Sequence, residues 1–199
     1  MKIHPIIKRL NVLSYLLLLG SPCVWSNGKQ LNVRVGMLKG SYSGPVKASF
    51  MTIPSVDVEM ELFQSSKVST LVKANISMNI SKAKIFYSGV GAGQRYYFGG
   101  PGMLVDRIEG DYTLEAYARN RYFAGWEVGV AQVLVKEYTA TYSVVGSVVE
   151  FGAMGGYIYQ VSKTLGLSVG VGGGFGMGFT TVSVNGINIR MNAGLSYIF

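Results

Sequence analysis

Three carboxylates recur at every second position of one short stretch, at Asp57, Glu59 and Glu61. At that spacing they share one face of a β-strand, where paired carboxylates could carry general acid and base chemistry. They could also line an ion path, or pair with basic side chains of neighbouring strands. We expect the pairing, because charges in a space of low dielectric need partners. The predicted charge network comprises Arg34, Asp57, Glu59, Glu61, Lys73, Arg95, Glu127, Glu150 and Arg190.

Other residue types that carry chemistry are scarce. The single histidine, His4, and the single cysteine, Cys23, both lie in the first 26 residues. If that segment is removed, no imidazole and no thiol remain for catalysis, metal binding or a disulfide. A lipidated Cys23 is the alternative, but Pro22 stands where a small residue is expected. We therefore predict no enzyme activity, no metal site and no cofactor.

The first 26 residues have the pattern of a secretory signal peptide. Three basic residues precede an apolar stretch from Leu10 to Gly20, and Val24 and Ser26 provide the cleavage pattern. The apolar stretch is about half of the roughly 20 residues that a spanning helix needs. We predict cleavage near Ser26, which leaves residues 27–199 as one domain.

The composition is poor in charge, with 14% charged and 49% hydrophobic residues, whereas soluble domains contain about 25% charged residues. The predicted signal peptide holds three of the 18 basic residues and none of the 10 acidic ones, so a modest basic excess remains. No basic run carries this excess, and we predict no nucleic-acid partner.

After residue 30 the dominant pattern is strict alternation of apolar residues with polar or small ones, which is typical of β-strands. Asn185-Gly186 is a strong hairpin signal, and Gln64 to Lys67 is typical of a tight polar turn. Segments of roughly ten residues suffice to cross a bilayer at a tilt. Eight alternating segments occur, within Leu31–Met37, Val56–Leu62, Val72–Ile80, Phe86–Phe98, Tyr122–Val130, Val149–Tyr159, Leu165–Phe179 and Ile187–Phe199.

The two faces of these segments differ in size and charge. In Leu165 to Phe179 bulky apolar residues alternate with glycine or serine, and Gly173 alone takes an apolar position. The charged residues share the register of the small ones. A narrow lumen accepts small or paired side chains, whereas an Arg or Lys facing lipid near the midplane costs about 2–4 kcal/mol. A soluble barrel would show the opposite arrangement.

We therefore predict an all-β fold, a transmembrane up-and-down antiparallel β-barrel of eight strands with lipid outside. A ten-stranded barrel is the alternative, because the connector from Gly99 to Asn120 is unusually long. Either a strand starts near Tyr112, or Leu104 to Ala118 forms extra structure at the interface.

Aromatic residues collect at one end of the predicted strands. If the N-terminus starts in the periplasm, this end is periplasmic, and the rings form an interfacial girdle. The predicted girdle comprises Phe63, Tyr96, Phe98, Tyr122, Tyr157 and Tyr159.

The terminal segment has apolar residues at every second position, Leu195, Tyr197 and the final Phe199. Together with the signal peptide and the eight segments, it resembles small bacterial outer-membrane barrels of the OmpA, OmpX and OmpW kind. The resemblance implies a Gram-negative-type outer membrane, periplasmic chaperones during transit and insertion by the outer-membrane assembly machinery, which reads the terminal strand. Enzymes of this architecture rely on a histidine, which the mature chain lacks. A barrel fold alone implies no activity.

The leading functional hypothesis is a non-enzymatic barrel with a structural or surface-interaction role and a narrow lumen plugged by charges. The alternative is a narrow conduit or carrier for small solutes. Lys39 to Lys47 and Lys136 to Tyr142 are predicted outer loops. We expect outer-membrane lipid and lipopolysaccharide as surroundings, and these loops could contact lipopolysaccharide phosphates.

Overall fold

The computed structural model describes residues 28–43, 48–79, 84–100, 105–109, 112–116, 118–136, 143–178 and 185–199. The predicted signal peptide lies outside these residues. Within the described ranges, no helix is long and apolar enough to cross a membrane. The strands are β1 (Lys29–Ser43), β2 (Ala48–Phe63), β3 (Val68–Asn79), β4 (Lys84–Phe98), β5 (Val105–Glu109), β6 (Tyr112–Ala116), β7 (Asn120–Lys136), β8 (Ser143–Gln160), β9 (Leu165–Gly178) and β10 (Asn185–Ile198).

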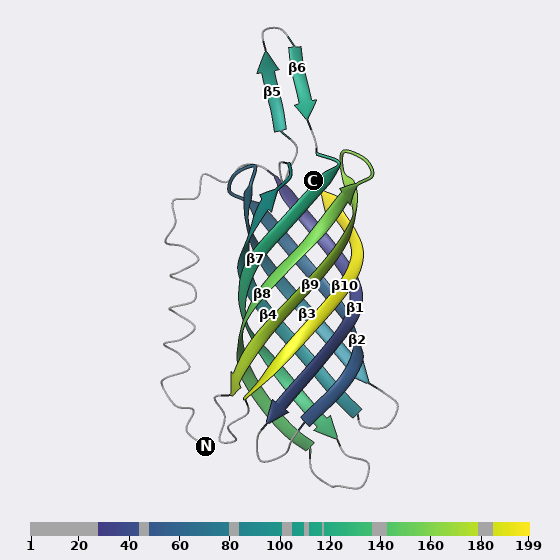
Figure 1. The fold of residues 1–199 in the computed structure, drawn as a ribbon, viewed down its shortest axis with the longest axis vertical. Helices are drawn as coiled ribbons and strands as arrows, with labels where there is room; N and C mark the ends of the chain where they lie inside the picture. Colours follow the sequence, from purple (N-terminus) through teal and green to yellow (C-terminus); the bar gives the residue numbers. More distant parts are fainter. Residues whose placement is uncertain are drawn as a thin grey trace.

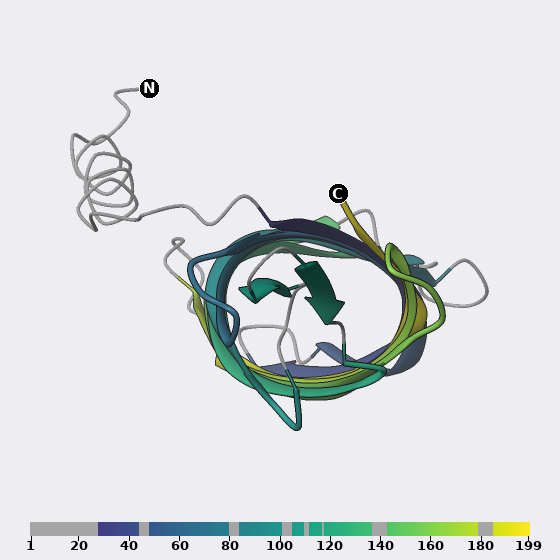
Figure 2. The same ribbon diagram turned by 90° about the horizontal axis from the view of Figure 1, so that it is seen from above.

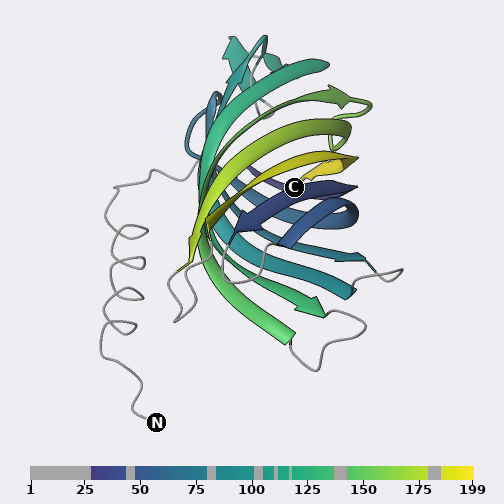
Figure 3. The ribbon, with the colours of Figure 1, turned by 60° about the horizontal axis from the view of Figure 1, so that its bottom comes forward.

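Eight of these strands form a closed barrel in the order β1-β10-β9-β8-β7-β4-β3-β2 (Figure 1). All neighbours are antiparallel, and the strands tilt around a common axis (Figure 3). The last strand closes against the first, from Gln30 opposite Ile198 to Ser43 opposite Asn185. The predicted eight-stranded up-and-down barrel is confirmed. The strands run from 12 to 18 residues, longer than the predicted ten, because the backbone ladders continue past the alternating segments.

The long connector forms a separate hairpin of β5 and β6, so the ten-stranded alternative is wrong. Each of its strands has five residues, whereas a spanning strand needs about 9–11. Strand β4 pairs directly with β7, from Lys84 opposite Lys136 to Phe98 opposite Tyr122, which leaves no place for further strands. The hairpin projects beyond one end of the barrel and lies within its outline when seen along the axis (Figures 1 and 2).

The two ends of the barrel differ in their connections. The termini end carries the start of β1, the end of β10, the turns at residues 64–67 and 161–164, and the β5-β6 hairpin. The opposite loop end carries the connections between β1 and β2, β3 and β4, β7 and β8, and β9 and β10.

Alternation places bulky apolar residues outside and polar or small residues inside. In β9, Leu167 and Val171 are about half exposed, at 51% and 52%, while Ser168 is buried. In β2, Val56 and Val58 face outward and are exposed, and the intervening Asp57 is buried. This arrangement is the reverse of a water-soluble protein, so the outer wall is suited to lipid.

Glycines in β9 test this assignment of faces. An added Cβ at the inward Gly174 would lie 2.9 Å from the backbone oxygen of Phe151, whereas at the outward Gly173 nothing is nearer than 3.4 Å. We expect Gly174→Leu to lower the free energy of unfolding by about 1–3 kcal/mol through overpacking, and Gly173→Leu to leave it nearly unchanged. Urea unfolding in phospholipid vesicles measures both. Equal effects would contradict the assignment.

Candidate functional site

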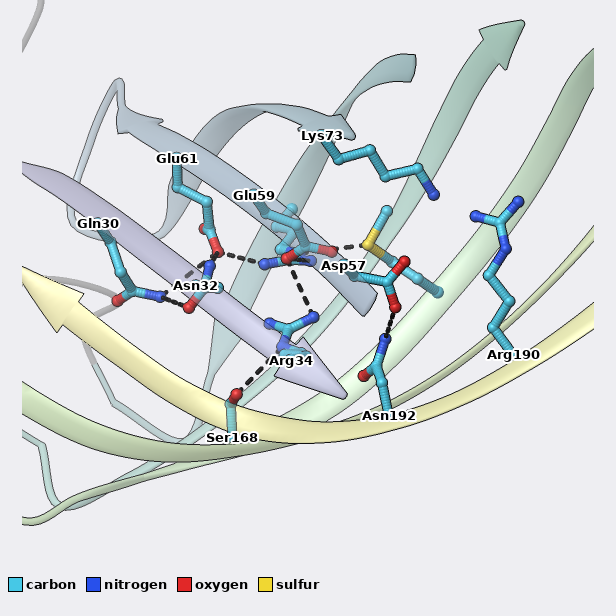
Figure 4. Close-up of polar contacts among 12 residues, drawn as sticks. Gln30, Asn32, Arg34, Asp57, Glu59, Glu61, Lys73, Ser168, Arg190 and Asn192 are labelled. Atoms are coloured by element: carbon cyan, nitrogen blue, oxygen red, sulfur yellow. Dashed lines mark hydrogen bonds and ion pairs between the residues drawn. The ribbon is translucent and has the colours of Figure 1, made fainter. Parts of the chain in front are cut away.

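The site is the lumen itself, where inward side chains of β1, β2 and β4 meet across the barrel axis. Glu59 on β2 accepts a hydrogen bond from Arg95 at 2.5 Å and forms an ion pair with Arg34 at 3.0 Å. Arg34 and Glu59 point toward each other in Figure 4. Arg34 also donates to the Ser168 hydroxyl at 3.0 Å. One carboxylate therefore joins two guanidinium groups from different strands.

The next carboxylate on β2, Glu61, is fully buried and anchors the polar contacts toward the termini end. It pairs with Arg95 and accepts hydrogen bonds from Asn32 at 2.7 Å, Ser69 at 2.7 Å and Tyr97 at 2.6 Å. A buried carboxylate needs several donors to offset its lost hydration. Glu61 has them from three strands, β1, β3 and β4.

Aromatic rings support the arginines of this group. The guanidinium of Arg95 lies 4.5 Å from the ring centroid of Phe123, and that of Arg34 lies 5.6 Å from the same centroid. Such contacts contribute about 0.5–2 kcal/mol each, more when water is excluded. Phe123 packs with Phe63, Tyr97 and Ile158 in an apolar layer at the termini end of the lumen.

A second polar group lies toward the loop end, around Glu150 on β8. This carboxylate accepts from Tyr42 at 2.6 Å, Tyr87 at 2.5 Å, Asn188 at 2.8 Å and Arg190 at 2.7 Å. Each of its oxygens has at least two donors, so its charge is well satisfied. Beyond it lies a second apolar layer, made of Leu38, Tyr42, Ile53, Tyr87, Ala131, Val133 and Val148.

Arg190 extends the second group toward the middle of the barrel. Its other terminal nitrogen donates to Glu127 at 3.1 Å, and Lys73 forms an ion pair with the second oxygen of Glu127. Asp57 stands apart from these ion pairs and accepts from the Asn192 amide at 3.1 Å. The structure thus brings eight of the nine predicted residues into two ion-paired groups, Arg34 with Glu59, Glu61 and Arg95, and Lys73 with Glu127, Glu150 and Arg190.

Two small cavities adjoin these groups. One of about 30 Å³ lies between them and is lined by residues of both, including Arg34, Glu59, Lys73 and Arg190, together with Asp57. The other, of about 10 Å³, has a lining that includes Asn75, Tyr87 and Glu150. Since one water needs roughly 10–15 Å³ of such space, the larger cavity suits two or three waters and the smaller one about one, and both are too small for a sugar or an amino acid. Among the described residues, no cluster of three or more His, Cys, Asp or Glu side chains could hold a metal ion.

The predicted girdle needs one correction. Phe63 is fully buried and contacts Tyr97 inside the barrel, with ring centroids 5.6 Å apart. It shares the odd register of Glu59 and Glu61, so its side chain points inward. The other five predicted girdle residues, Tyr96, Phe98, Tyr122, Tyr157 and Tyr159, lie at the termini end on the opposite register, and all but the half-buried Tyr157 are exposed.

Rings of the girdle contact one another along the outer wall. The ring centroids of Phe98 and Tyr122 lie 6.1 Å apart, and those of Tyr122 and Tyr157 lie 5.0 Å apart. In the terminal strand, Leu195, Tyr197 and Phe199 are exposed on the outer side.

Sequence reasoning missed several inward residues. Arg121 donates to Gln30 at 3.1 Å and to Gln160 at 2.6 Å, and is buried in the lumen. It has the same register as Glu127, so starting the predicted segment one residue earlier, before Tyr122, would have found it. Tyr42 gave no comparable signal, because a tyrosine near a strand end suits either face. Tyr87 shares the register of Arg95, so its inward face was predicted, but its contact with Glu150 was not.

The two neighbouring carboxylates of β2 allow a matched test of the network. Glu59→Gln removes the carboxylate that joins Arg34 and Arg95, whereas Asp57→Asn changes a carboxylate that accepts a hydrogen bond from the Asn192 amide. We expect Glu59→Gln to lower the free energy of unfolding by about 3–5 kcal/mol, since breaking a buried pair leaves uncompensated charge. Asp57→Asn should cost clearly less. Urea unfolding in vesicles decides, and equal losses would argue against Glu59 as the joining group.

Comparisons with known proteins show which solved structures share this fold. No protein-family model and no characterised protein sequence matches the chain. Neisserial surface protein A superposes with a TM-score of 0.60 at 13% identity, covering 84% of this chain and 96% of that one. Outer membrane protein OprG from Pseudomonas aeruginosa gives 0.58 at 9% identity, covering 88% and 97%. Ail, the attachment invasion locus protein of Yersinia pestis, gives 0.51 at 10% identity, covering 85% and 98%.

Identities this low establish the fold alone, and they agree with the resemblance noted in the sequence. The chain is a closed eight-stranded antiparallel barrel, and its fold is similar to the folds of these three proteins.

Proposed function

We propose that this protein is an integral barrel of a Gram-negative-type outer membrane, without catalytic activity, whose lumen is closed by its own side chains. It serves the envelope as a structural element or through surface contacts. The observation that carries the proposal is charge balance. In the described strands five acidic and five basic side chains point inward, and ion pairs or hydrogen bonds hold each of them.

The outer wall supports the membrane location. Large apolar side chains such as Val35, Ile76, Val130 and Met191 are exposed at about half of their surface or more on strands around the barrel. Soluble monomers rarely expose a continuous apolar surface of this kind. In a lipid environment this apolar surface is not in contact with water, so exposing it has no hydration cost. A closed barrel also leaves no unpaired strand edge in the lipid.

The packing along the barrel axis supports the proposal of a closed lumen. Apolar layers lie at both ends of the described lumen, and the ion-paired groups fill the space between them. A passing ion would have to separate pairs that have little access to water. The cavities of about 30 Å³ and 10 Å³ have space for a few waters at most and offer no room for a sugar or an amino acid.

A narrow conduit remains the second candidate, favoured by the charged lining of the central cavity, which includes Arg34, Glu59 and Arg190. If side-chain pairs exchanged partners, this cavity would become part of an aqueous path. The two candidates differ in a directly measurable property, conductance.

Planar-bilayer recording separates them. We expect the refolded protein to give no stable conductance steps, because the paired side chains block the axis. A porin added to the same bilayer is the positive control, and heat-modifiable migration in detergent gels confirms that the sample is folded. Stable, charge-selective steps that change on Glu59→Gln or Arg190→Gln would overturn the closed lumen and support the conduit.

The predicted partners follow from the same proposal. Lipid surrounds the outer wall, and the two predicted outer loops contact lipopolysaccharide phosphates. Lys39 to Ser43 of the first predicted loop belong to β1 and Lys136 belongs to β7, while residues 44–47 and 137–142 lie outside the described residues. During biogenesis, periplasmic chaperones carry the chain, and the assembly machinery reads the terminal strand. The exposed ring of Phe199 stacks with Tyr197, their centroids 6.1 Å apart, which presents both rings on the outer side.

Assembly through this strand predicts a strong effect of Phe199. Deleting Phe199, or replacing it with Asp, should leave the protein in the periplasm or degraded, because the outer aromatic surface of the terminal strand is lost. Cell fractionation with blotting measures this, and Val169→Asp in the neighbouring β9 controls for a charge on the lipid face. Normal outer-membrane levels of the Phe199 variants would count against this role.

A further inference from the structure

The described connections at the termini end each carry an exposed basic residue. These are Lys29 at the start of β1, Lys67 in the β2-β3 turn, Arg119 before β7 and Lys163 in the β8-β9 turn. We call these four residues the basic collar. Residues 28–29, 64–67, 99–100, 118–119 and 161–164 contain no acidic residue, and the described acidic residues of the connection between β4 and β7, Asp106, Glu109 and Glu115, belong to the β5-β6 hairpin.

Backbone hydrogen bonds fix the collar around the rim. The Tyr97 amide donates to the Lys67 carbonyl at 2.7 Å, and the Gln160 amide donates to the Arg119 carbonyl at 2.8 Å. Next to Lys163, the Thr164 carbonyl accepts from Ile198 at 2.7 Å. The backbone at or next to these basic residues is therefore held by hydrogen bonds. The four residues are spread around the circumference of the barrel rim.

The collar lies beside the outward aromatic residues of the same end. Tyr122 follows Arg119 by three residues, Tyr96 pairs in register with Val68 next to Lys67, and Tyr159 precedes the turn that holds Lys163. Aromatic rings of barrels lie at the level of lipid headgroups, and long basic side chains reach from there to phosphates. The collar is thus at the height of the headgroups.

Neither the lumen nor the hairpin covers this outer side. The inward acidic residues bind inward partners, as Glu61 does with Arg95 and Glu150 with Arg190. The β5-β6 hairpin projects along the barrel axis and lies within the outline of the barrel (Figure 2).

We propose that the basic collar binds the headgroups of anionic phospholipids in the leaflet at the termini end. The inference rests on the membrane location proposed above and goes beyond it, because it names the lipid class and one rim. Each Lys or Arg close to an anionic surface strengthens association by about fivefold, and the effect decays within a Debye length.

A tryptophan reporter at the collar tests this inference. Tyr122→Trp in a Trp126→Phe background places the single tryptophan of residues 27–199 beside Arg119. Quenching by brominated phosphatidylglycerol and by brominated phosphatidylcholine in vesicles gives the local preference for the anionic lipid. We expect the reporter to show a several-fold preference for phosphatidylglycerol over phosphatidylcholine. This ratio should fall toward 1 when all four collar residues become Gln. It should also fall in 1 M salt, where screening acts within about 3 Å.

Two controls make the result specific. Changing Lys29, Lys67 and Lys163 to Arg keeps the charge and should keep the preference. A reporter near the loop end, Ile187→Trp in the same background, should give one value with or without the collar charges, since Ile187 is exposed at the opposite end.

The outcomes separate this inference from the proposed function. Equal preferences at the collar reporter in the native-collar and Gln-collar proteins would overturn lipid binding by the collar while leaving the membrane location intact. Failure of the protein to insert into either type of vesicle would instead overturn the membrane location.

Discussion

Closing eight strands into a barrel is the constraint on which the rest of the structure depends. The pairing of β1 with β10 satisfies the backbone groups at what would otherwise be two free edges. Closure also gives every strand one face toward a narrow lumen and one toward the surroundings. The alternation of apolar with polar or small residues must then continue along whole strands. A shift of one residue would turn the inward side chains outward and the outward side chains inward.

Glycine and long charged side chains are two parts of one packing solution. On β10, Asn188, Arg190 and Asn192 face inward, and their partners in register on β9 are Gly174, Gly172 and Gly170. The thin glycine wall leaves space beside each polar side chain, so Arg190 can cross to Glu150 and Glu127. Glu127 is likewise flanked by Gly93 and Gly152 on its neighbouring strands.

The face of each charged residue in the predicted network was predictable, whereas its partners were not. Arg34 is opposite Asp57 in register, yet it pairs with Glu59, and Asp57 binds Asn192 instead. Alternation defines which residues enter the lumen, but strand tilt and side-chain reach determine which of them meet. Phe63 makes the same point, since its register indicated the lumen and only its place near a strand end suggested the girdle.

The charges inside the barrel are better explained by their role in specifying the register of the strands than by a contribution to the stability of the fold. An apolar filling of similar volume would be as stable as buried ion pairs or more so. Strands that are apolar on both faces, however, would not specify their register, because a slip of one residue would cost little. In β2 the same slip would turn Asp57, Glu59 and Glu61 toward lipid and bury Val56 and Val58 in the lumen. Charged residues facing lipid are costly, so these carboxylates hold the strand in the register that closes the barrel.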